Sequence, residues 1–155
     1  MDEFKIFIAL SKALTGIESV GSVEPGSLNE RMAKDYFRQL KAQFGADFVA
    51  LLTLYDSKSG DIDPLAALLH DASFKDSIES MAKQVVNVWL LSQYRVETPE
   101  RKGDAAPLFD AGYYEKGLIW SAIKAHPIGF SHQSHGYWTT NPAQTVIVHF
   151  KEEQA

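Results

Sequence analysis

The 155-residue sequence contains no cysteine. A chain without thiols forms no disulfide bond, has no cysteine nucleophile and cannot attach haem through a CxxCH motif. Zinc sites that depend on thiolate ligands are excluded for the same reason. At this length we expect a hydrophobic core large enough to stabilise the fold without cross-links or a structural metal.

Glycine-rich phosphate-binding motifs are absent as well. Neither GxGxxG nor GxxxxGK[ST] occurs in the sequence, and in such loops backbone N–H groups bind the phosphates of nucleotides and dinucleotides. The strained GxSxG turn that presents a nucleophilic serine is also missing, since Gly129-Phe130-Ser131-His132 supplies only half of it. We therefore expect this chain alone to bind no FAD or nucleotide and to have no Ser-His-acid triad.

An excess of positive charge is lacking too. The chain has 15 basic and 20 acidic residues, which gives a net charge of -5 and argues against a nucleic-acid surface. No apolar run approaches the roughly 20 residues of a membrane-spanning helix, so we expect no direct membrane span. The N-terminus has acids where a signal peptide has bases and lacks a twin-arginine pair, which predicts either a cytoplasmic chain or one whose leader was removed.

Hydrophobic spacing of three and four residues predicts a mainly α fold, a compact single-domain bundle of about six helices that covers residues 1–155. Residues 17–26 are expected to form a connector after Gly16, a glycine suited to a left-handed helix end. Within the bundle, Trp89 is predicted to anchor the central core. The six helices are expected at residues 4–15, 27–44, 48–55, 64–69, 73–89 and 110–126.

Three of these helices begin with recognisable capping signals. A short polar side chain before the first turn accepts a hydrogen bond from an N–H group that has no partner within the helix. Proline is favoured in the first turn, where its missing N–H has no cost. The pairs are Ser27 with Glu30, Asp63 with Pro64, and Ser73 with Asp76.

Two long stretches are not predicted to be helical. Residues 95–110 are rich in proline and charge and are expected to form an exposed arm. Residues 126–142 form an irregular loop of aromatic rings, histidines and glycines, because Pro127 cannot continue the preceding helix. Beyond this loop, Thr145 to Phe150 has the composition of one short C-terminal strand.

Basic residues line the outer side of the helix predicted at 27–44. They either form a docking stripe for an acidic partner or anionic lipid, or they belong to an ordinary solvated face interleaved with acidic residues. The solvated face is the usual arrangement. The residues are Arg31, Lys34, Arg38 and Lys41.

Two sequence patterns resemble a known family. They are FxxLSxxLTG from Phe7 to Gly16 and YxxGLIWxAIxAHPxGxSxxxxGYW from Tyr114 to Trp138. Together with Trp89, these residues resemble the small (gamma-type) subunit of bacterial membrane-bound, FAD-dependent sorbitol and sugar dehydrogenases. The likeness spans nearly the whole chain, and its C-terminal pattern is the more specific of the two.

The resemblance implies a non-catalytic accessory subunit. Such a subunit binds and stabilises, and in exported relatives escorts, a large FAD-dependent subunit of the glucose-methanol-choline type. A multihaem cytochrome c subunit is the implied electron acceptor, FAD is expected only in the partner, and the complex is expected at the membrane in the periplasm. Relatives typically carry a Tat leader, and this sequence departs from that pattern.

The aromatic and histidine residues of the C-terminal pattern are the candidate partner interface, because aromatic side chains supply much of the affinity at protein interfaces. Each ring could instead belong to the domain core. An alternative function is a stand-alone small or metal-dependent enzyme that uses His126, His132 and His135. His132 and His135 are three residues apart, a spacing at which two imidazoles can share one ion, and His126 is near in sequence. The interface candidates are Tyr114, Trp120, His126, Phe130, His132, His135, Tyr137 and Trp138.

Overall fold

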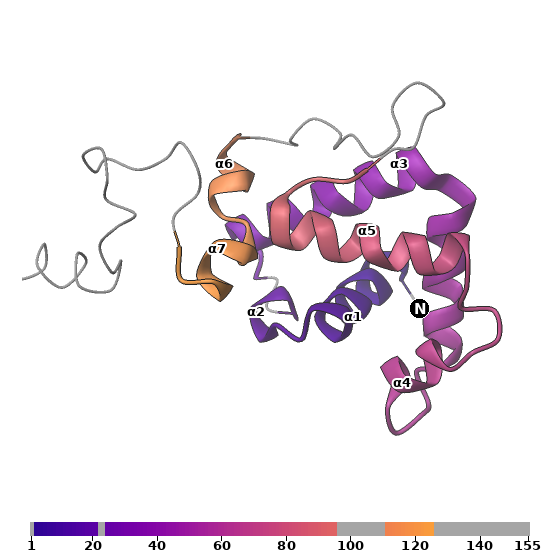
Figure 1. The fold of residues 1–155 in the computed structure, drawn as a ribbon. Coiled ribbons are helices and arrows are strands. Elements are labelled where there is room, and N and C mark those ends of the chain that lie inside the picture. The colour runs from indigo at the N-terminus through magenta and orange to yellow at the C-terminus, as the bar shows by residue number, and fades with distance from the viewer. Residues whose placement is uncertain (1, 22–23, 96–110, 126–155) are drawn as a thin grey trace, which may run out of the picture.

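The computed structural model describes residues 2–21, 24–95 and 111–125. This part of the chain is mainly helical, as predicted (Figure 1). The 96–110 portion of the expected arm, the loop at 126–142 and the strand from Thr145 to Phe150 lie outside the described residues. The helices are α1 (Glu3–Thr15), α2 (Glu18–Gly21), α3 (Leu28–Ser57), α4 (Pro64–Leu69), α5 (Ser77–Leu91), α6 (Ala111–Glu115) and α7 (Leu118–Ala122).

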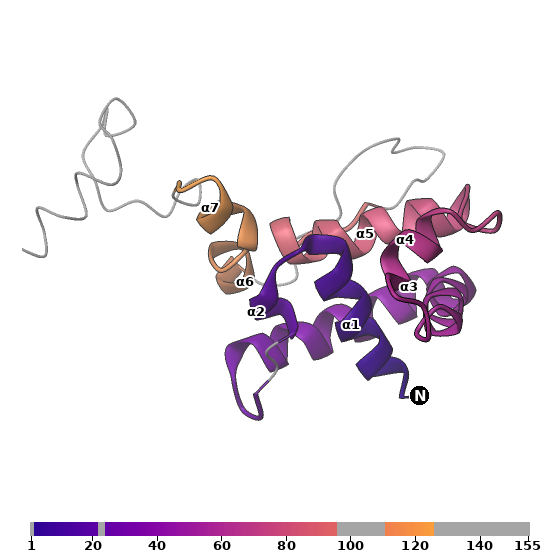
Figure 2. The same cartoon turned by 90° about the horizontal axis from the view of Figure 1, so that it is seen from below.

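The core lies where α1, α3 and α5 pack against one another (Figures 1 and 2). Trp89 on α5 is 1% exposed, as its predicted role in the core requires. Its ring stacks on Phe7 of α1 at 6.5 Å between centroids and meets Tyr36 of α3 edge-on at 5.3 Å. Aromatic pairs in these geometries contribute stability beyond the area that they bury. Trp89 therefore joins the three main helices.

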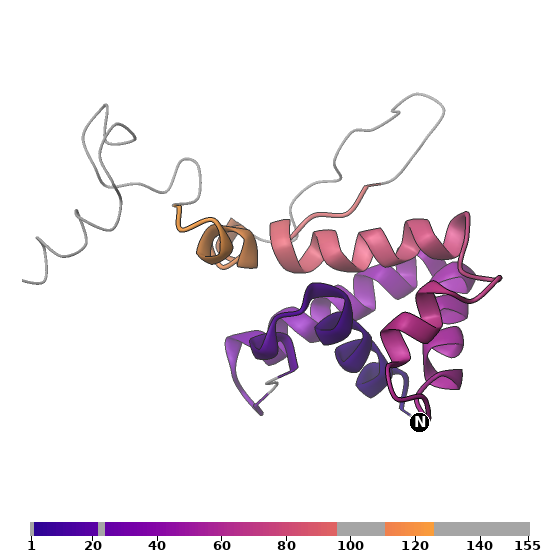
Figure 3. The same cartoon turned by 60° about the horizontal axis from the view of Figure 1, so that its bottom comes forward.

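Helix α3 bends at Gly45, whose φ of 45° and ψ of -108° lie outside the helical region. The sequence predicted two helices, 27–44 and 48–55, on either side of this glycine. The interruption at this glycine is confirmed, and the second half of α3 begins directly after it instead of at residue 48. The half after Gly45 turns away from the half before it, as Figure 3 also shows.

Two of the predicted helix starts are confirmed by their caps. The Ser27 Oγ atom accepts a hydrogen bond from the Glu30 N–H at 3.0 Å. The Glu30 carboxylate reaches back to accept from the Gly26 N–H at 2.7 Å. At α4, the Asp63 Oδ1 atom accepts from the Ala66 N–H at 3.0 Å.

The third predicted start was wrong. Helix α5 begins at Ser77 instead of Ser73, and Asp76 at its N-cap makes no side-chain capping bond. The residues before it form a turn, in which the Asp71 carboxylate accepts from the Ser73 N–H at 2.8 Å. Ser73 therefore belongs to a turn that the Asp71 side chain stabilises, which is an arrangement that aspartate commonly adopts.

The segment after α1 was only partly predicted. Gly16 has a φ of 66°, so it ends α1 in the left-handed region as expected. The connector predicted at 17–26 contains the short helix α2 instead of being wholly irregular. Within it, Val20 is buried in the core cluster, which explains why this stretch folds back onto α1.

Within the described part of the chain, no helix combines the length and the apolar character needed to cross a bilayer.

Candidate functional site

Helices α6 and α7 form a small platform at the end of the molecule where α5 ends (Figures 1 and 3). The sequence predicted one helix here, from Asp110 to His126. The structure has two short helices with Lys116 and Gly117 between them, so the prediction of one continuous helix was wrong. Helix α7 packs against α5.

A buried hydrogen-bond chain holds this platform to the core. Ser92 follows the last residue of α5, is fully buried, and adopts a φ of 52° in the left-handed region. Its Oγ atom donates to the Tyr113 carbonyl at 2.8 Å and lies 2.6 Å from the Tyr36 Oη atom. Since serine has a single hydroxyl proton, Tyr36 must donate to Ser92. The Tyr113 hydroxyl in turn donates to the Asp35 carboxylate at 2.7 Å.

Burial changes the pKa of the Tyr36 hydroxyl. Removal of its phenol from water raises the pKa of Tyr36 well above the ordinary value of 10.0, while the hydrogen bond with Ser92 acts in the opposite direction. The hydroxyl is therefore neutral in the folded protein across the physiological range, and it remains available as the donor that Ser92 requires.

Gly117 allows the closest approach between the platform and the core. A Cβ atom at this position would lie 2.7 Å from the Leu90 carbonyl oxygen, a backbone atom of α5. Gly117 is buried, and its lack of a side chain is what lets the α5 backbone come this close. The break between α6 and α7 falls at this contact.

Tyr114 and Trp120, two of the predicted interface residues, pack together on the platform. The Trp120 indole N–H donates to the Tyr114 carbonyl at 2.7 Å. Their rings meet edge-on at 5.1 Å between centroids. Both side chains are half-buried. They therefore shape the platform and also present part of their surface to solvent.

Helix α7 ends earlier than the sequence predicted. The Ala125 N–H donates to the Trp120 carbonyl at 2.9 Å and Lys124 has a φ of 54°, a helix end of the Schellman type. This ending precedes the proline that was expected to stop the helix near His126. It leaves Ile123 56% exposed, one of the few large apolar side chains on the described surface.

The other interface candidates cannot be placed beside this pair. They lie outside the residues that the structure describes, as does the histidine set of the alternative metal-dependent enzyme. Among residues 2–21, 24–95 and 111–125, no three histidine or acidic side chains are grouped as metal ligands would be. The undescribed candidates are His126, Phe130, His132, His135, Tyr137 and Trp138.

The basic residues of α3 lie on an exposed face. Lys34 pairs with Glu30 at 2.7 Å and Arg38 pairs with Asp35 at 2.9 Å. Lys41 pairs with Glu3 of α1. Most of this charge therefore has a partner within the chain, which is the arrangement of a solvated face.

Sequence reasoning did not identify Ser92 or Asp35 as residues that position the site. Nothing in Leu91-Ser92-Gln93 indicates a left-handed residue, since glycine and asparagine are the usual signals. Asp35 is one of the acidic residues that interleave with the basic residues of helix α3, and the sequence suggested only a solvated face for them. The one indication of its role in the sequence was that it is an acidic residue among the basic residues of α3.

Comparison of the chain with protein-family models, with curated proteins and with solved structures found no match.

Proposed function

We propose that this chain is a non-catalytic accessory subunit that binds and stabilises the FAD-dependent catalytic subunit of a sugar or polyol dehydrogenase complex. The complex would lie in the periplasm, at the membrane, and FAD would belong to the partner. One observation carries the proposal. Residues of the two resembling patterns, far apart in sequence, form a single frame, in which Phe7 stacks on Trp89 and Gly117 packs on the next residue, Leu90.

The proposed contact surface is the platform of α6 and α7. Tyr114 and Trp120 offer half-buried rings, and Ile123 adds an exposed apolar side chain next to them in sequence. Rings that are already held in place lose little conformational freedom on binding, which favours them as anchors at interfaces. The remaining interface candidates follow directly in the sequence, from His126 onward.

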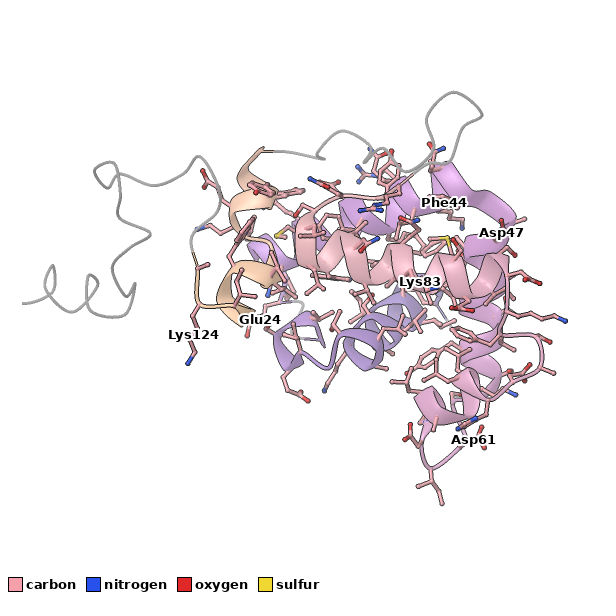
Figure 4. All side chains as sticks on the ribbon, in the orientation of Figure 1. Glu24, Phe44, Asp47, Asp61, Lys83 and Lys124 are labelled. Carbon is pink, nitrogen blue, oxygen red and sulfur yellow. The ribbon has the colours of Figure 1, made fainter. Side chains whose placement is uncertain are left out.

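Co-expression with a flavoprotein dehydrogenase encoded beside this chain tests the proposal. The soluble yield and flavin content of the flavoprotein should rise when the chain is present. Ile123→Asp should reduce co-purification by tenfold or more, because a carboxylate would be buried without a partner. Ile62→Asp is the matched control, since Ile62 is fully exposed beside Asp61, at the end of the molecule opposite Lys124 (Figure 4).

Two results would count against this function. One is an unchanged yield of flavoprotein in the absence of the chain. The other is a purified chain that carries one metal ion and loses it when His126, His132 and His135 are replaced by alanine. The second result would favour the metal-dependent enzyme instead.

A further inference from the structure

A polar cleft of about 810 Å³ lies between α3 and α5, away from the platform. The bend at Gly45 shapes one wall, since Gln43, Phe44 and Asp47 flank this glycine on α3. The opposite wall is the polar side of α5 that includes Lys83. Figure 4 shows Phe44 and Asp47 along one side of this region and Lys83 across from them. The volume is within the range of pockets that hold small molecules.

Packing against neighbouring side chains holds the apolar residues of the cleft in place. Met81 is buried at its base. The Phe44 ring is half-buried and meets the Tyr94 ring edge-on at 5.9 Å. A rigid aromatic wall of this kind can contact the C–H groups of a ligand without reorganising.

The described residues compensate the charge in the cleft only in part. The Lys83 ammonium pairs with Glu79 at 2.7 Å. The Arg95 guanidinium and the Asp47 carboxylate form no ion pair with any residue in the described ranges. Among the described residues, the cleft thus offers one uncompensated cation and one uncompensated carboxylate.

A hydrogen bond from its backbone holds Arg95 beside α5. Its N–H donates to the Gln84 Oε1 atom at 2.8 Å, which ties the residue to the wall of α5. Because the Gln84 oxygen is occupied, the NH₂ group of this side chain remains to donate to a ligand. Gln43 and Asn87 add two more carboxamides, each able to donate and to accept.

We propose that this cleft binds a small polyhydroxylated carboxylate of the sugar-acid class. The planar guanidinium of Arg95 matches a carboxylate with two parallel hydrogen bonds. The carboxamides and Asp47 pair with hydroxyl groups, which both donate and accept. One free cation among the described lining residues suits a singly charged ligand, and the Asp47 carboxylate disfavours a doubly charged phosphate. This site is independent of the proposed accessory role, because it does not involve the platform.

Titration of the isotopically labelled full chain with D-gluconate, followed by NMR, tests the proposal. The side-chain NH₂ signals of Gln43, Gln84 and Asn87 should shift and saturate. Sorbitol, which has the hydroxyls without the carboxylate, and propionate, which has the carboxylate without the hydroxyls, should each bind at least tenfold more weakly.

Arg95→Gln should weaken gluconate binding by about tenfold or more, since a charge-assisted bond is lost. The side chain is exposed and the backbone N–H is retained, so the fold should not change. Arg31→Gln, an exposed arginine of α3 outside the cleft, should bind gluconate like the unmodified chain. The proposal is overturned if gluconate causes no saturable shift, if sorbitol or propionate binds as tightly, or if both arginine variants bind alike.

Discussion

At the scale of single residues, Gly117 decides how closely the platform approaches the core. In Gly117→Ala the new methyl group would lie 2.7 Å from the Leu90 carbonyl oxygen, so two backbones would have to separate. We expect a loss of about 1 to 3 kcal/mol in the free energy of unfolding, as in other overpacked sites. Urea denaturation measures this loss.

Gly60→Ala is the matched control for that substitution. A Cβ atom at Gly60 meets nothing within 4 Å, and the residue has no positive φ. The control should stay within about 0.5 kcal/mol of the unmodified chain. Equal stability of the two alanine variants would show that the close approach at Leu90 does not constrain the fold.

Tyr36 should make the stability of the protein depend on alkaline pH. Burial raises its pKa above 10.0, so above that pH the unfolded chain releases a proton that the folded chain retains. The stabilising contribution is therefore fully present below pH 10 and decreases as the pH rises further. Between pH 8 and pH 11 the free energy of unfolding should fall by about 1 kcal/mol more for the unmodified chain than for Tyr36→Phe. Parallel losses in the two proteins would contradict this assignment.

At the scale of elements, two positions with nearly the same backbone dihedral angles carry different residues. Gly45 at the bend of α3 has φ 45° and ψ -108°, and Asp76 before α5 has φ 51° and ψ -113°. Side chains with a Cβ atom are strained in this region, by roughly 1 to 2 kcal/mol. Glycine therefore suits the first position, and aspartate is strained at the second.

Exchanging the residue types at these positions should have opposite effects. Gly45→Ala should lower the free energy of unfolding by about 1 to 2 kcal/mol, although the space around it is open. Asp76→Gly should raise it by about 1 kcal/mol, because no side-chain capping bond is lost. Thermal denaturation of both variants checks this. A lowered free energy of unfolding for Asp76→Gly would disprove the strain at Asp76.

The elements that could be predicted from the sequence are those whose signals are local. Periodicity placed α1, α4, the two halves of α3 and most of α5, and the caps at Ser27 and Asp63 act within one helical turn. The break at Gly117 could not be predicted, because its cause is the backbone of Leu90, a distant part of the chain. The late start of α5 was missed because Ser73 and Asp76 suit a turn as well as a helix cap.

At the scale of the whole molecule, the core and the candidate site are joined through a few specific contacts. Trp89 joins the three main helices, and the chain that follows it contacts Gly117 through Leu90 and Tyr113 through Ser92. The sequence predicted Tyr114 and Trp120 as interface residues from their aromatic character and from the resembling pattern. It could not show that one ring rests on the other, because that contact depends on how α6 and α7 are broken.

The central claim is that this molecule acts by binding a larger redox protein. Sedimentation of the purified chain mixed with a large FAD-dependent sugar or polyol dehydrogenase, monitored by flavin absorbance, measures this directly. The account predicts that the flavin-bearing species becomes heavier when the chain is added, and that Ile123→Asp abolishes the change while Ile62→Asp does not. A flavin-bearing species of unchanged mass, with an isolated chain that itself oxidises a sugar or polyol, would contradict it.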